Sequence, residues 1–325
     1  MRPIRLLLIT LFATAVAVGG EAAPAGSPEE ALLAPVKALR QNDVLALYKA
    51  MPAEERAEAE AEWAAHRDQP PTEQDAKLDE MLQLVNQPNA VDLLMLQAEP
   101  ALAQIDPQQL GFQLQMGAGM IGMGLASSPE GMPFAEIIQG LATDMMTWLP
   151  TSGINDPAKL RQMLTHLVAA GKAYGVADSA GLRALSLDDV LTRSGDALNE
   201  FKAGLAVYGC DLDAFLDSMQ VTDVAGTGDA RTANLQFTVL GKPRTLPLKL
   251  KLVDGTWTTD ESTFAPLTDL AAQAGGMGGG PGPGPGPGFD DAMQDGGETI
   301  EIAPIPADVA EPAAPAEEPA PAATP

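Results

Sequence analysis

The hydrophobic pattern of the chain is helical over most of its length. Apolar residues three and four positions apart lie on one face of a helix, and such a stripe is clearest after Asp156. Its members are Leu160, Met163, Leu164, Leu167 and Val168. The pattern predicts helices from Ser27 to about Met219. No fixed-period repeat accompanies them, which argues against a solenoid.

Capping signals indicate where these helices begin. A side-chain oxygen just before the first turn accepts a backbone N–H, and proline is favoured at the first helical position. Ser27–Pro28 combines both features, and the spacing of Ser186 and Asp189 fits a capping box. Further starts are predicted at Pro52, Thr72, Asp106–Pro107 and Asp156–Pro157.

Past Val221 the period changes to two. The alternating apolar residues are Ala233, Leu235, Phe237 and Val239, then Leu246, Leu248, Leu250 and Leu252. This alternation is typical of strands with one buried face. Gly241–Lys242 and Asp254–Gly255 are predicted as tight turns. Pro247 cannot donate to a strand ladder, so we expect it at an edge or a bulge.

These patterns predict a mainly α fold. A helical, bundle-like body over residues 27–219 is followed by a small C-terminal antiparallel β-meander over residues 220–262. One face of the meander needs helices to cover it, which gives an α+β arrangement. Whether body and meander form one domain or two stays open.

Residues 275–325 have a different composition. Residues 275–288 are almost entirely Gly and Pro, and the remainder is rich in Ala, Pro and acids without Lys or Arg. Such a segment buries too little apolar surface to offset the entropy of ordering, so we expect a disordered tail. Residues 298–305 alternate polar residues with isoleucine. They are either plain disorder or a strand that adds to a partner's sheet edge.

The first residues predict export. Arg2 and Arg5 precede an apolar run from Leu6 to Val18, and small residues follow. This is the pattern of a secretory signal peptide, here residues 1–20 with cleavage between 17 and 25. A run of about 13 residues is too short for a stable anchor. We expect a periplasmic or secreted protein with no integral membrane segment in the mature chain.

Composition narrows the classes of partner. The formal net charge is −25, and aromatic residues make up 4% of the chain. An acidic surface repels nucleic acid and anionic lipid, so neither is expected as a partner. Cys210 is the single cysteine, which excludes an intramolecular disulfide. We expect it to be a small buried apolar residue.

Familiar catalytic motifs are missing from the sequence. It has no G-x-S-x-G, S-x-x-K, H-E-x-x-H, C-x-x-C or Walker A pattern. His66 and His166 are the histidines of the chain, and we expect both on the surface. We therefore predict a non-enzyme with no catalytic residue, no cofactor and no metal ligand. The alternative is an enzyme, such as a hydrolase, that uses two Asp or Glu carboxylates far apart in sequence and brought together by folding.

Residues 107–126 allow two interpretations. Residues 117–122 match the dinucleotide fingerprint G-x-G-x-x-G, but Ser127–Pro129 follow too soon for the long helix that this fingerprint needs. A buried helix, whose glycines allow close approach of neighbouring backbones, fits better.

Two residue groups suggest metal ions. Three thioethers share one face of the helix just described, either as core or as a soft-metal face suited to Cu(I): Met116, Met120 and Met123. Three carboxylates resemble a Ca²⁺ loop at first sight: Asp211, Asp213 and Asp217. They lack the glycine and late glutamate of an EF-hand, and a capped helix after Cys210 explains them better.

The closing part of the folded region resembles a known family. A helix region at Cys210–Met219, two strands rich in leucine and valine, and the sequence Val253–Trp257 carry the likeness. On these features residues 186–261 resemble the end of NTF2-like modules in bacterial envelope proteins. The long N-terminal helix hairpin and full curved sheet of that family have no counterpart in the sequence. The resemblance implies a binding or accessory module.

These features together predict an exported, soluble, non-enzymatic interaction or accessory protein of the bacterial envelope. Its helical body would bind a protein partner, and its tail would act as a spacer or docking arm. The alternative is a small-molecule or metal-binding periplasmic module. Such a module would use a pocket between helices and meander, or the face formed by the three methionines.

Overall fold

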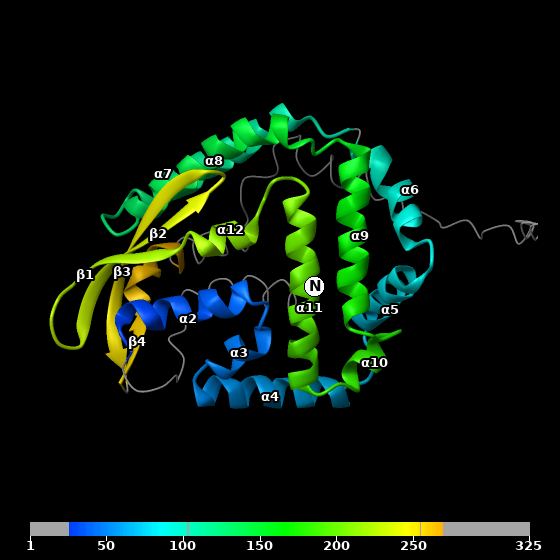
Figure 1. The fold of residues 1–325 in the computed structure, drawn as a ribbon, viewed down its shortest axis with the longest axis horizontal. Helices are drawn as coiled ribbons and strands as arrows, with labels where there is room; N and C mark the ends of the chain where they lie inside the picture. Colours follow the sequence, from blue (N-terminus) through cyan, green and yellow to red (C-terminus); the bar gives the residue numbers. More distant parts are fainter. Residues whose placement is uncertain (1–25, 103, 254, 269–325) are drawn as a thin grey trace, which may run out of the picture. The chain divides into compact units, whose positions relative to one another are not determined.

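The computed structural model describes residues 26–102, 104–253 and 255–268. Within them the chain forms a mainly helical body followed by a four-stranded antiparallel sheet (Figure 1), which confirms the predicted fold class. The predicted signal peptide (residues 1–20) and the predicted tail (residues 275–325, including the segment 298–305) lie outside the described residues.

The helices begin at capping residues that the sequence largely predicts. Their bounds are α2 (Pro28–Arg40), α3 (Val44–Lys49), α4 (Ala53–Asp68), α5 (Glu73–Asn86), α6 (Ala90–Leu102), α7 (Pro107–Leu125), α8 (Met132–Ser152), α9 (Pro157–Ala173), α10 (Ser179–Arg183), α11 (Leu187–Ala206) and α12 (Leu212–Asp217). The Ser27 hydroxyl accepts the N–H of Glu30 at 3.3 Å. Thr72 and Asp75 form a reciprocal capping box at the start of α5. The short helix α3, capped by Asp43, is not predicted.

The strands form a meander. They are β1 (Gln220–Ala225), β2 (Ala230–Val239), β3 (Lys242–Val253) and β4 (Thr256–Thr259), paired in chain order. β2 and β3 are joined through Leu240–Gly241, not through the predicted Gly241–Lys242. Both turn residues have positive φ, as a type I′ turn requires. Val253 pairs with Thr256, so β3 and β4 form a hairpin. Of the predicted second turn, Gly255 has a φ of 81°, and Asp254 lies outside the described residues.

The first half of β3 is a sheet edge, because β4 pairs with Leu250–Val253 alone. Lys249 directs its backbone away from β2: its N–H donates to Thr263 Oγ1 at 3.0 Å, and its carbonyl accepts the Asp260 N–H at 2.7 Å. Backbone groups two residues apart point the same way along a strand, so Pro247 places its missing N–H at this edge. The edge position is confirmed, and proline there discourages pairing with another strand.

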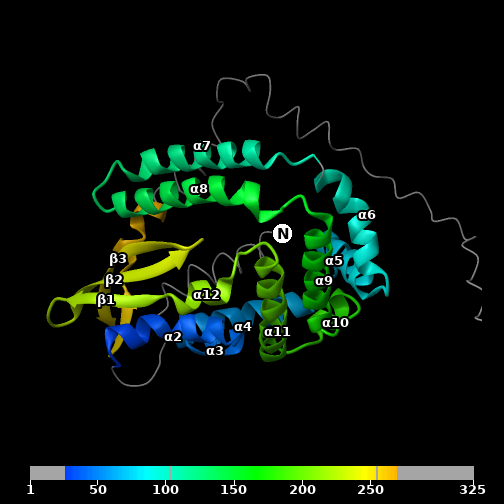
Figure 2. The same ribbon diagram turned by 45° about the horizontal axis from the view of Figure 1, so that its top comes forward.

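The buried face of the sheet forms a large hydrophobic core. Its strand residues are Ala233, Leu235, Leu246, Leu248, Leu250 and Trp257. Phe134 and Ala135 of α8 pack into this cluster, and α8 contacts β3 (Figure 2). α2 contacts β1 and β4, with Ala31 and Leu32 against the same cluster. Helices therefore cover the apolar face, as its alternation predicts.

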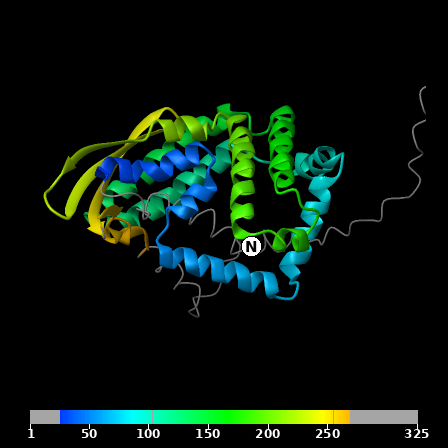
Figure 3. The same cartoon turned by 60° about the horizontal axis from the view of Figure 1, so that its bottom comes forward.

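A second core lies around α9. Leu160 and Leu164 pack against α6, and Val168 packs against residues of α5 and α6. α11 runs along another side of α9 (Figure 3). The predicted stripe is confirmed at these positions, but Leu167 is 37% exposed. The buried residues Leu160, Leu164 and Val168 are four positions apart, so each lies only about 40° around the helix from the one before. Leu167, next to Val168 in the chain, points about 100° away from it.

Candidate functional site

α7 and α8 form a helical hairpin, with α7 on the side of α8 that faces away from the sheet (Figure 2). The Asp106 carboxylate caps α7 by accepting the N–H of Gln108 at 2.8 Å. Gly131 permits the turn into α8, because a Cβ there would lie 2.0 Å from the carbonyl oxygen of Leu125. The hairpin is thus fixed at both ends of α7.

α7 contacts α8 through a narrow line of mostly small residues. Its buried members are Gly111, Ala118, Gly122 and Leu125. A Cβ on Gly122 would lie 2.4 Å from Gln139 Nε2, and one on Gly111 would lie 3.4 Å from Met146 Cα. These two glycines allow the close helix approach that the sequence predicts.

The opposite side of α7 presents large apolar side chains to solvent. Phe112, Met116, Met120 and Met123 lie within about 80° of arc, and we call these four residues the methionine face. Their exposed fractions are 56%, 56%, 72% and 71%. The segment is a helix, as predicted, but the prediction that this helix is buried is wrong. The reason is that its small residues, not its large ones, meet α8.

The methionine face lies on a helix without charge. Residues 107–125 contain no Asp, Glu, Lys or Arg. Their polar side chains are Gln108, Gln109, Gln113 and Gln115. Leu114 and Ile121 add exposed apolar surface on the flank of the same helix. Large exposed apolar patches of this kind mark contact sites on soluble proteins.

The dinucleotide fingerprint at residues 117–122 lies in the middle of α7. A phosphate site of that type needs free backbone N–H groups at the start of a helix. In mid-helix those groups donate to carbonyls one turn earlier. The segment therefore offers no cradle for a pyrophosphate, in line with the helical interpretation favoured by the sequence.

No family model, curated protein or solved structure matches the chain. Function is therefore inferred from the chemistry of its sites. In the part of the chain that the structure describes, no helix is long and apolar enough to cross a membrane, and α7 is no exception.

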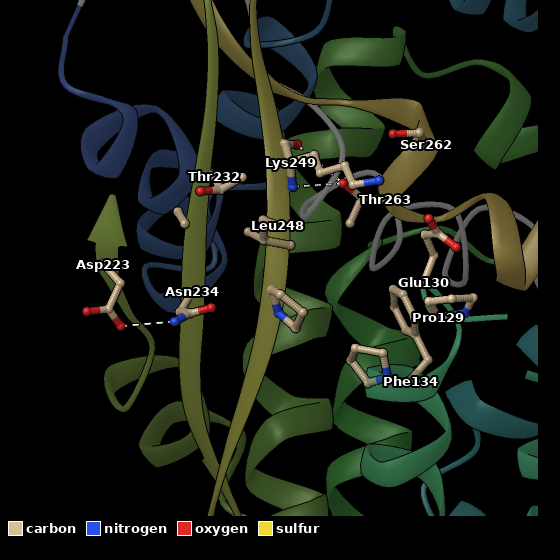
Figure 4. Close-up of a pocket in the computed structure, with 13 residues that line it drawn as sticks. Pro129, Glu130, Phe134, Asp223, Thr232, Asn234, Leu248, Lys249, Ser262 and Thr263 are labelled. Atoms are coloured by element: carbon tan, nitrogen blue, oxygen red, sulfur yellow. Dashed lines mark hydrogen bonds between the residues drawn. The ribbon is translucent and has the colours of Figure 1, made fainter. Parts of the chain in front are cut away.

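A pocket of about 450 Å³ lies between the α7–α8 turn and the sheet (Figure 4). Its polar lining comes from that turn, from β1, β2 and β3, and from the short helix η1 (Glu261–Thr263): Glu130, Asp223, Thr232, Asn234, Lys249, Ser262 and Thr263. Asp223 has a φ of 55° beside a bulge in β1, and Asn234 Nδ2 donates to its carboxylate at 2.9 Å. Figure 4 shows Glu130 and Asp223 on opposite sides of Leu248.

The two histidines have different environments. His66 is exposed on α4, as predicted, with its ring centroid 5.9 Å from that of Trp63. His166 is half-buried, and its Nδ1 lies 2.8 Å from Glu200 Oε2 on α11. His166 is therefore less exposed than predicted. Gly204 lets α11 approach α9 closely, so a second side of α9 is also covered.

The three aspartates near Cys210 belong to a structural network. Asp211 caps α12 by accepting the Ala214 N–H at 2.9 Å. The partners of the other two are basic: Arg40 reaches Asp213 at 3.1 Å and Asp217 at 2.9 Å, and buried Lys202 Nζ bonds Asp213 at 2.7 Å. Among the described residues, no three His, Cys, Asp or Glu side chains form a group suited to a metal ion. The capped helix is confirmed in place of a Ca²⁺ loop.

Cys210 is half-buried between α11 and α12. Burial raises the pKa of its thiol above the ordinary value, so the thiolate is disfavoured at neutral pH. This environment fits a packing role better than a reactive one. The predicted burial of Cys210 is reached only in part.

Proposed function

We propose that this protein is an exported, non-enzymatic interaction protein of the cell envelope, and that its helical body docks a partner protein on the methionine face. The proposal is carried by the exposure of Phe112, Met116, Met120 and Met123 on a charge-free helix. Covering apolar surface contributes about 25 cal/mol per Å². Flexible methionine side chains also adapt to irregular partner surfaces.

Charge favours a protein over a lipid surface as the occupant of this face. Helices that lie on membranes usually combine an apolar face with Lys and Arg on the polar face, and α7 contains no Lys or Arg. The chain's net charge of −25 also opposes contact with anionic headgroups. We therefore propose an apolar groove or helix face as the matching surface on the partner.

The compartment in this proposal comes from the sequence. The predicted signal peptide supports export, and the resemblance of residues 186–261 to NTF2-like accessory modules supports a binding role. The composition of residues 275–325 supports a spacer or second docking arm.

In-cell crosslinking followed by purification of the mature chain tests the docking role. Met120→Glu places a charge in the methionine face. Leu96→Glu is the matched control, because Leu96 of α6 is 74% exposed and Met120 is 72% exposed. One specific partner should be recovered with the wild type and with Leu96→Glu, and lost with Met120→Glu. A chain ending at residue 274 tests the contribution of the tail.

Equal recovery with both glutamate variants would contradict docking on the methionine face. Circular dichroism of each variant separates this outcome from misfolding. The partner recovered in cells is then purified, and it should bind the isolated wild-type chain but not Met120→Glu.

A small-molecule-binding role is the alternative, and the pocket of Figure 4 supports it. Native mass spectrometry of the protein purified from its own compartment tests this role. A bound mass that disappears in Thr232→Trp, which puts a large side chain in the pocket lining, would support it. A bare mass for the wild type would remove it.

A further inference from the structure

Three thioethers of the methionine face lie close enough along α7 to act together. Met116 and Met120 are four residues apart, and Met120 and Met123 are three residues apart. Both spacings place side chains side by side on a helix, with Cβ atoms about 5–6 Å apart. Met120 therefore lies between the other two.

The surroundings leave these side chains free to converge. All three are more than half exposed. Apart from adjacent residues and the backbone of α7 itself, no heavy atom of the described residues lies within 4 Å of a Cβ built on Gly117 or Gly119, which are next to Met116 and Met120 in the chain. Each methionine has three rotatable bonds, so Met116 and Met123 can lean toward Met120. Packing requirements of the fold do not account for three exposed thioethers in this arrangement.

The donor set decides which ion fits. Thioether sulfur is a soft, neutral ligand that selects Cu(I), whereas Cu(II) prefers nitrogen and oxygen in a square arrangement. Hard cations need carboxylate or carbonyl oxygen, and residues 107–125 contain no acidic side chain. A thioether also carries no proton near neutral pH, so its ligation does not compete with protonation.

We infer that Met116, Met120 and Met123 bind one Cu(I) ion through their three sulfur atoms. This inference does not rest on the docking role proposed above. It concerns sulfur chemistry, whereas docking concerns the apolar character of the same surface. Leucine preserves the apolar character and removes the sulfur, so the two uses can be separated by substitution.

Cys210 is the competing soft ligand in the chain. Its thiol is half-buried, and burial raises its pKa, so it is a weaker ligand than a free thiolate. The variants compared below all retain Cys210. A difference between them therefore reports on the methionines.

The test is an anaerobic titration of the purified mature chain with Cu(I) against a chromophoric Cu(I) chelator. The test variant is Met116→Leu/Met120→Leu/Met123→Leu. The control variant, Met81→Leu/Met132→Leu/Met146→Leu, removes three exposed methionines outside the methionine face. We expect one Cu(I) per wild-type chain, an affinity at least about tenfold weaker in the test variant, and no change in the control.

Unchanged affinity in the test variant, or an equal loss in the control, would overturn the inference. So would X-ray absorption of the loaded wild type that shows nitrogen or oxygen in place of a sulfur-only shell. Leucine and methionine have similar helix propensities, so the test variant is expected to fold. Partner recovery with the test variant separates the two proposals. If the test variant loses Cu(I) binding but still recovers the partner, both proposals are supported. If it still binds Cu(I), only the Cu(I) inference is contradicted.

Discussion

α7 and α9 have the same kind of N-terminal cap, but they place their large apolar side chains differently relative to the hydrophobic core. Both have an aspartate cap followed by proline, at Asp106–Pro107 and Asp156–Pro157, and both carry large apolar residues at helical spacing. α9 buries Leu160, Leu164 and Val168 against α5 and α6 and exposes charged residues such as Arg161. α7 buries small residues and exposes large ones.

This difference separates two uses of an apolar stripe. In α9 the buried side chains of Leu160, Leu164 and Val168 stabilise the fold, since neighbouring helices surround them. In α7 the contact with α8 is made by Gly111, Ala118 and Gly122, which leaves the methionine face outside the core. The contrast supports a role for that face in binding.

The largest expected effect is a difference in stability between the two helices. Leu164→Ala in α9 should lower the free energy of unfolding by about 2–5 kcal/mol, because it leaves a cavity among buried side chains. Met120→Ala in α7 should change it by no more than about 0.5 kcal/mol. Urea denaturation measures both. Comparable losses would mean that Met120 is part of the core after all.

A substitution in the contact between α7 and α8 should open the hairpin. Gly111→Val places two methyl groups where a Cβ alone would lie 3.4 Å from Met146 Cα. Overpacking of this kind costs about 1–3 kcal/mol. Hydrogen exchange should show faster exchange in α7 and little change in α9. Faster exchange in α9 as well would show that the two regions are not independent.

Acid should weaken the surroundings of α9 through capping carboxylates. Hydrogen bonds from the Thr72 N–H and hydroxyl hold the pKa of Asp75 on α5 below its usual range, and Ser186 does the same for the pKa of Asp189 on α11. A folded-state pKa below the unfolded value adds stability above about pH 4, which is lost as pH falls through the folded value. Melting temperature against pH should therefore fall below pH 4, and less steeply in Asp75→Asn. An identical slope in that variant would contradict the assignment.

The smallest expected effect is a gain in stability within α7. Gly117 is in mid-helix, and apart from adjacent residues and the backbone of α7 itself, no heavy atom of the described residues lies within 4 Å of a Cβ built there. Gly117→Ala should therefore stabilise the protein by about 0.5–1 kcal/mol through the lower backbone entropy of the unfolded chain. Thermal unfolding measures this gain. A loss would indicate a neighbour at that position.

Local signals predicted more of this molecule than packing signals did. The caps at Ser27, Thr72 and Ser186 and the alternation of β2 and β3 depend on nearby residues, so the sequence contains them in full. Which side chains of α7 are exposed depends on which side of the helix contacts α8. Apolar residues occur all around α7, so its sequence pattern does not single out that side. His166 is half-buried because α11 covers a second side of α9, which periodicity within α9 does not reveal.

The candidate site was predictable in composition but not in location. The sequence shows three methionines on one helical face and leaves open whether they are core or surface. The signal that decides this is the line Gly111, Ala118 and Gly122, a small-residue contact opposite the large side chains. The sequence suggested a pocket between helices and meander, but not its position beside Asp223, which depends on a bulge in β1 and on the position of the α7–α8 turn.

Site-specific photocrosslinking in cells tests the central claim most directly. A photoreactive amino acid is placed at position 120 of α7 and, for comparison, at the equally exposed position 96 of α6. The account predicts one discrete crosslinked partner from position 120 and none from position 96. The same pattern from both positions, or no product from position 120, would contradict it.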